Sequence, residues 1–60
     1  MYQRMYVDEP NNWQEISLDE AKDKLSAYYT NVDEVLMILR QGSTLRTPWA
    51  FYRWVEVLPI

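Results

Sequence analysis

Residues 46–54 read RTPWAFYRW and concentrate the side chains of this chain that are best suited to contact another molecule. The stretch holds four aromatic side chains and two arginines in nine positions. Tryptophan, tyrosine and arginine are enriched at the energetic centres of protein interfaces. The same residue types could stack on nucleic-acid bases and hold phosphates, although the second half of the chain has no lysine. A third interpretation is structural: the aromatics cover the thin sheet of a small protein.

We predict a contact surface on one side of the last strand. The alternation of its residues places Phe51, Val55 and Val57 against the helices. Arg53 shares the face of Phe51, and Tyr52 and Trp54 then point outward, beside Arg46. The predicted partner-binding residues are Arg46, Trp49, Tyr52, Arg53 and Trp54.

A second candidate surface is acidic. Five carboxylates fall in or near the first turns of two predicted helices, where the helix dipole favours negative charge. They are interpreted either as solvated helix N-termini or as a mimic of nucleic-acid phosphates that blocks a basic groove on an enzyme. The residues of this acidic face are Asp19, Glu20, Asp23, Asp33 and Glu34.

The sequence offers no recognisable catalytic or metal-binding constellation. Cysteine and histidine are both absent, which removes disulfides, thiolate metal sites and the commonest general base. The chain has no glycine-rich phosphate loop and no nucleophile elbow, and its Asp-Glu pairs lack calcium-loop spacing. We therefore predict a non-enzymatic protein that needs no cofactor or metal.

Local patterns predict the elements that position these residues. Ser17 and Glu20 form a capping-box pattern before an amphipathic run, and Asn31 with Glu34 repeats that signal. Gly42 is suited to end the second helix in the left-handed conformation. Pro48 interrupts the alternation that follows, because proline cannot donate to a sheet ladder. The expected elements are a strand at 2–7, helices at 18–28 and 32–41, a short strand at 43–46 and a longer strand at 51–58.

This order, β-α-α-β-β, predicts the α+β class, with an antiparallel sheet packed on two short helices. Sixty residues form one domain, 1–60. The net charge of −3 is uneven, since residues 1–34 carry −5 and residues 35–60 carry +2. There is no apolar run of about 20 residues, and the first residues are too polar for a signal peptide. We therefore expect an intracellular, cytoplasmic protein.

The function that these patterns favour is a small protein-binding or regulatory module, similar in role to an inhibitor or adaptor, that uses an aromatic–arginine sheet face. One alternative is a single-stranded nucleic-acid-binding accessory protein. Another is an acidic, nucleic-acid-mimicking inhibitor of the kind that phages and mobile elements carry. Because 48% of the residues are hydrophobic and the last strand is expected at a sheet edge, we also predict a homodimer that buries Tyr52 and Trp54.

Overall fold

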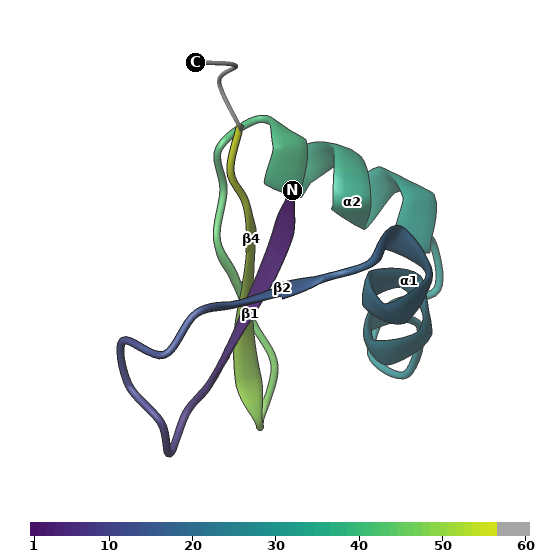
Figure 1. Ribbon diagram of the computed structural model, residues 1–60. Helices are drawn as coiled ribbons and strands as arrows, with labels where there is room; N and C mark the ends of the chain where they lie inside the picture. Colours follow the sequence, from purple (N-terminus) through teal and green to yellow (C-terminus); the bar gives the residue numbers. More distant parts are fainter. Residues whose placement is uncertain (57–60) are drawn as a thin grey trace.

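The computed structural model describes residues 1–56 and forms one four-stranded antiparallel sheet with two helices. Figure 1 shows both helices on the same side of the sheet. The α+β class and the antiparallel sheet packed on two short helices are confirmed. Val57 and Leu58, which were expected in the last strand, lie outside the described residues. The elements are β1 (Tyr2–Tyr6), β2 (Gln14–Ile16), α1 (Leu18–Ser26), α2 (Val32–Arg40), β3 (Leu45–Arg46) and β4 (Ala50–Trp54).

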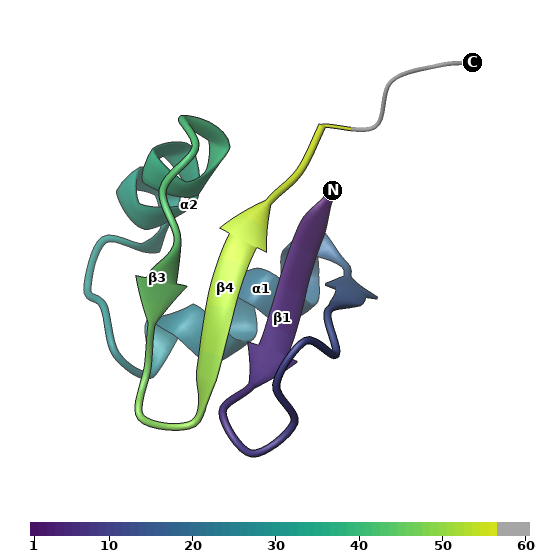
Figure 2. The same cartoon turned by 90° about the vertical axis from the view of Figure 1, so that its left-hand side faces the viewer.

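The sheet order is β2-β1-β4-β3, so the last strand β4 is an interior strand and not an edge. The edges are β2 and β3, which are only three and two residues long. Short edge strands give other chains little to pair with. Figure 2 shows that the β1–β2 and β3–β4 connections lie at one end of the sheet, opposite the N-terminus.

Strand β2 was missed in the sequence because it is short and mostly polar. Its residues pair with β1 in the register Tyr2↔Ile16, Gln3↔Glu15 and Arg4↔Gln14. Only Ile16 of the three is buried. Three residues are too few to establish an alternating pattern, so the sequence of β2 alone does not indicate a strand.

Ser17 and Asn31 cap the two helices as the sequence predicts, and both helices end slightly earlier than expected. The Glu20 carboxylate pairs with Arg4 and not with the Ser17 amide, so within the described residues only half of the capping box forms. The Ser17 hydroxyl accepts from the Glu20 amide at 3.1 Å, and the Asn31 side chain accepts from the Glu34 amide at 3.4 Å. Gly42 has φ +106° and donates to the Leu39 carbonyl at 3.0 Å. Because these signals are local, they do not depend on how the domain packs.

The core lies between the sheet and the two helices. From α1 it takes Ala21 and Leu25, and the α2 stripe contributes three further residues, Val35, Leu36 and Leu39. The sheet contributes Ile16, Ala50 and Tyr52.

The predicted facing of the last strand is wrong. Tyr52 is only 5% exposed and packs with Ala50 toward the helices, while Trp54 is partly buried against the same core. Phe51 and Arg53 alternate with these residues and therefore lie on the opposite face. The predicted facing would have turned Arg53 into the core, where an unpaired guanidinium is costly. The observed facing keeps that charge outside and buries a strip without charged residues.

Candidate functional site

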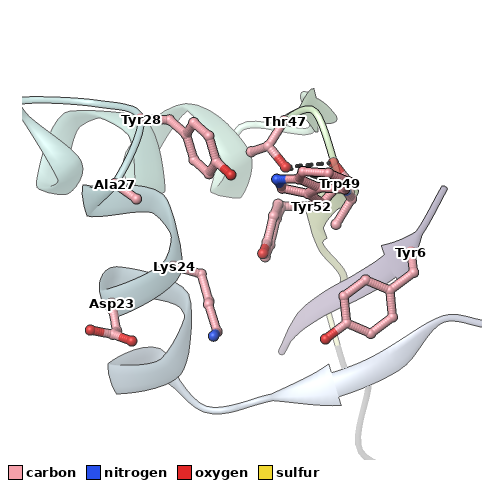
Figure 3. A pocket seen from close by; sticks show the side chains of 9 residues that line it. Tyr6, Asp23, Lys24, Ala27, Tyr28, Thr47, Trp49 and Tyr52 are labelled. Carbon is pink, nitrogen blue, oxygen red and sulfur yellow. Dashed lines mark hydrogen bonds between the residues drawn. The ribbon is translucent and has the colours of Figure 1, made fainter.

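A cleft of about 430 Å³ opens between α1 and the end of the sheet that carries the β3–β4 turn. Figure 3 shows aromatic side chains from the sheet and from the end of α1 around this space. Its lining residues are Tyr6, Asp23, Lys24, Ala27, Tyr28, Thr47, Trp49, Ala50 and Tyr52.

The floor of the cleft is buried and hydrogen-bonded. Thr47 and Ala50 close the β3–β4 turn, because the Thr47 amide donates to the Ala50 carbonyl at 2.8 Å and the Ala50 amide donates to the Thr47 hydroxyl at 3.1 Å. Tyr52 lies beside them and points its hydroxyl toward the space between Lys24 and Tyr6 (Figure 3). Burial raises the pKa of the Tyr52 phenol, although the Arg4 charge opposes this. The hydroxyl is therefore protonated at neutral pH and able to donate.

The rim carries three exposed aromatic rings. Trp49 is 69% exposed, Tyr28 is 45% exposed and Tyr6 is 39% exposed. The backbone of Trp49 is nevertheless held by a hydrogen bond, because its carbonyl accepts from the Val7 amide at 3.0 Å. Pro48, the residue before it, has a φ angle fixed by its ring. Trp49 therefore lies on an ordered turn, so a partner that binds it loses little backbone entropy.

The polar groups of the cleft are largely free. Within residues 1–56, the structure gives no protein hydrogen-bond partner to the hydroxyls of Tyr6, Tyr28 and Tyr52 or to the indole N–H of Trp49. The Lys24 ammonium also makes no ion pair within that part of the chain. Glu20, which lies one helical turn before Lys24, pairs with Arg4 at 2.8 Å.

A second hollow of about 450 Å³ adjoins the cleft. The two share Tyr6 and Trp49, so these rings form a ridge between them. Beyond the ridge, Val7 supplies apolar surface and Asp8 and Glu9 supply negative charge. The combined surface is aromatic in the middle and acidic at one end.

The outer face of the sheet is the face without helices in the described part of the chain. Arg53 donates to the Gln3 side chain at 2.8 Å, and its guanidinium lies 3.8 Å from the centre of the Trp13 ring. Arg46 lies 5.4 Å from the centre of the Phe51 ring. Long side chains of the protein therefore already cover part of its aromatic surface, as the structural interpretation of these residues expects.

The five predicted partner-binding residues do not form one surface. Trp49 and Tyr52 line the cleft, whereas Arg46 and Arg53 lie on the outer face. Trp54 packs on the core with Arg40 5.6 Å from its ring centre. Tyr6 and Tyr28, the other two rings of the rim, are not among the predicted partner-binding residues. Tyr6 ends β1 and Tyr28 lies just beyond α1. This position at the end of an apolar face is the sequence signal that could have identified them.

The acidic face is divided among separate contacts. Asp33 lies 3.4 Å from Lys22, and Glu34 accepts from the Asn31 amide group at 3.1 Å. Glu20 pairs with Arg4, and Asp23 lies at the cleft. Asp19 remains on the exposed first turn of α1. Neighbouring side chains therefore already engage three of these five carboxylates.

Two further observations concern the described residues, 1–56. They contain no group of three or more carboxylates that could hold a metal ion, and no helix with the length and apolarity that crossing a membrane requires. Comparison of the whole chain with protein-family models, curated proteins and solved structures found no match.

Proposed function

We propose that this chain is a non-enzymatic, cytoplasmic protein-binding module of adaptor or inhibitor type, and that the aromatic cleft is its contact surface. The observation that carries the proposal is the convergence of three exposed aromatic rings, Tyr6, Tyr28 and Trp49, on one cleft. Contiguous exposed apolar surface of this kind is uncommon on small soluble proteins and marks interaction sites. Trp and Tyr are also the residue types that dominate binding energy at protein interfaces.

The fixed backbone around the cleft supports the same function. The Val7–Trp49 hydrogen bond and the Thr47–Ala50 turn hold the rim in place before any partner arrives. A partner that buries these rings therefore loses little free energy to ordering the backbone, which favours affinity. The free hydroxyl and indole donors give a partner polar contacts beside the apolar ones.

Charge distinguishes a protein partner from nucleic acid at this surface. The cleft and the adjoining hollow contain Asp8, Glu9 and Asp23 against the single cation Lys24. Nucleic-acid binding draws on several cations that neutralise phosphates. Three carboxylates around one ammonium would repel a phosphate backbone.

A capture experiment tests the proposal. The immobilised protein is compared with a cleft variant, Tyr28→Ser with Trp49→Ser, and with an outer-face variant, Arg46→Ser with Arg53→Ser, in a lysate of the cells that produce it. All four residues are at least partly exposed, so circular dichroism should show folded protein in each case. We expect a partner that the wild type and the outer-face variant retain and the cleft variant loses. A partner that only the outer-face variant loses would place the contact on the other side of the sheet.

The alternative of single-stranded nucleic-acid binding would use the outer face, where Arg46 and Arg53 lie beside Phe51 and Trp13. Base stacking needs a free aromatic face, and Arg53 already occupies one face of Trp13. Titration with mixed-sequence single strands at low salt would quench tryptophan fluorescence if this alternative held.

The alternative of a nucleic-acid-mimicking inhibitor would use the exposed acids of α1. Reversing Asp19 and Asp23 to lysine would then abolish capture of a basic enzyme, whereas the cleft variant would still capture it. Glu20 is left unchanged in this test because it pairs with Arg4.

A further inference from the structure

We propose that the cleft and the adjoining hollow bind a proline-rich segment of the partner, in the polyproline II conformation, with a basic residue at one end over Asp8 and Glu9. This inference rests on the proposed function, because it specifies the chemistry of the partner at the same site. Three features of the surface lead to it: its hydrogen-bonding groups, its relief and its charge.

Most polar side chains of the cleft can donate a hydrogen bond, and its tyrosine hydroxyls can also accept one. Three tyrosine hydroxyls, the Trp49 indole N–H and the Lys24 ammonium line this space, and Asp23 is the one carboxylate among its described lining residues. An ordinary peptide segment brings one backbone N–H for each carbonyl, and each N–H needs an acceptor. Proline brings a carbonyl without an N–H. A proline-rich segment therefore offers carbonyls to the Trp49 indole N–H and the Lys24 ammonium, and it brings fewer N–H groups that need an acceptor.

The relief of the surface suits an extended segment with repeating ring contacts. Trp49 and Tyr6 form a ridge with a hollow on either side. Polyproline II segments dock on aromatic grooves, where their pyrrolidine rings pack against flat aromatic faces. Because this conformation is largely formed before binding, a small and shallow surface loses little affinity to ordering.

The charge distribution gives the segment a basic end. Asp8 and Glu9 line the hollow beyond the ridge, and Glu9 also accepts from the Asn12 side chain at 3.0 Å. Lys24 lies on the other side of the ridge, in the cleft. An arginine or lysine of the partner is therefore favoured beside the two carboxylates and disfavoured beside Lys24.

Two other occupants fit less well. A partner strand would need a long free edge, but β2 and β3 have only three and two residues. A cationic group inserted among the aromatic rings would meet the Lys24 ammonium in the same space. The proline-rich segment avoids both conflicts.

Fluorescence anisotropy with short labelled peptides tests the inference. The first peptide joins a proline-rich core to an arginine, and the second reverses that sequence, because the direction of binding is open. One control peptide replaces each proline with alanine, and another replaces the arginine with glutamate. We expect saturable binding of at least one proline-rich peptide, a loss of at least about tenfold for the alanine control, and a loss of about two- to fivefold for the glutamate control.

Protein variants locate the binding. Trp49→Ser should weaken the proline-rich peptide by at least about tenfold, as expected for a hot-spot tryptophan. Tyr28→Phe keeps the ring and removes one donor, so a loss of a few-fold would identify a hydrogen bond. Asp8→Asn with Glu9→Gln should remove only the preference for arginine over glutamate. Met37→Ser is the matched control, because Met37 is an exposed apolar residue of α2 that lines neither hollow.

The results distinguish a failure of the proline-rich segment from a failure of the proposed protein-binding function. Equal binding of the alanine control, or proline-rich binding that Trp49→Ser does not weaken, would overturn the inference. If no peptide binds while the captured partner still depends on the cleft, the proline-rich segment is refuted and the protein-binding function stands. If the captured partner is also independent of the cleft, both are refuted.

Discussion

Arg4 carries a nearly buried charge that pairs with Glu20. Removing the Glu20 carboxylate therefore has a well-defined expected effect on the free energy of unfolding. The Arg4 side chain is 12% exposed and pairs with Glu20 at 2.8 Å. It also donates to Gln14 at 3.1 Å and lies 4.4 Å from the centre of the Tyr6 ring. Its Nε is buried and has no hydrogen-bond partner within residues 1–56. The guanidinium therefore depends on Glu20 for most of its charge compensation.

The expected cost of Glu20→Gln follows from these exposures. Removing one partner of a fully buried ion pair costs about 3–5 kcal/mol, whereas an exposed pair contributes about 1 kcal/mol or less. The Glu20 side chain is 42% exposed, so in the variant water can partly compensate Arg4 for the lost carboxylate. We expect Glu20→Gln to lower the free energy of unfolding by about 1–2 kcal/mol. Asp19→Asn, one residue earlier in the same turn, should cost only about 0.3–0.5 kcal/mol through the helix dipole.

Arg4→Met should behave differently from Glu20→Gln, although both break the same pair. Methionine removes the buried charge together with the unpaired Nε, so its net cost should be within about 1 kcal/mol. Urea unfolding followed by circular dichroism measures all three variants. A domain of this size rarely has more than about 3–5 kcal/mol of stability. At an m value of about 1 kcal/mol/M, a loss of about 1–2 kcal/mol in Glu20→Gln should lower the urea midpoint by about 1–2 M. A Glu20→Gln shift no larger than that of Asp19→Asn, or a larger loss for Arg4→Met, would refute this reasoning.

Three further predictions follow from single residues and from composition. Gly42→Ala should lower the free energy of unfolding by about 1 kcal/mol in the same urea assay, because φ is +106° at this position. The added Cβ meets no atom within 4 Å, so backbone strain accounts for the whole effect. An unchanged urea midpoint would contradict this prediction. Burial raises the pKa of Tyr52, so above the ordinary value of 10.0 the unfolded state ionises first and stability falls as pH rises toward the folded pKa. Tyr52→Phe should remove that part of the alkaline loss, and equal alkaline loss in both proteins would contradict the burial argument. The homodimer stays a prediction, and sedimentation equilibrium at tens of micromolar tests it against the 7.3 kDa monomer. Pairing through β4 is excluded by its interior position, and Tyr52 is already buried within the monomer, so the predicted dimer contact through these residues is wrong and a dimer would use another surface.

The helices could be predicted from the sequence because their signals are local. Ser17, Asn31 and Gly42 define helix ends through contacts within a few residues, and the structure has those contacts. The α+β class followed from the same local patterns, since two capped helices stand between alternating segments.

The facing of β4 was not predicted because both of its faces contain aromatic residues. Phe51 favoured one face by hydrophobicity, while Tyr52 and Trp54 looked suited to solvent by their polar tips. The deciding term was the Arg53 charge, which would have been buried with Phe51. Burial of a tyrosine costs less than burial of an unpaired guanidinium, so the charge of Arg53 outweighed the hydrophobicity of Phe51.

The cleft was beyond prediction because its rim comes from three separate parts of the chain. Tyr6 ends β1, Tyr28 follows α1, and Trp49 lies in the β3–β4 turn. Only the pairing of β1 with β4, in which Tyr6 lies opposite Ala50, brings the first and third of these together. A long-range pairing of this kind leaves no local signal in the sequence.

The most direct test of the proposed contact surface is the response of the tryptophan indole N–H signals in the NMR spectrum of the labelled protein. The chain has three tryptophans, which report on the outer face (Trp13), the cleft (Trp49) and the core (Trp54). On titration with the captured partner, we expect the Trp49 indole signal and the Tyr6 and Tyr28 amides to shift, while the Trp13 indole signal stays in place. A shift of the Trp13 indole signal with an unchanged Trp49 signal would contradict the account and place the partner on the outer face of the sheet.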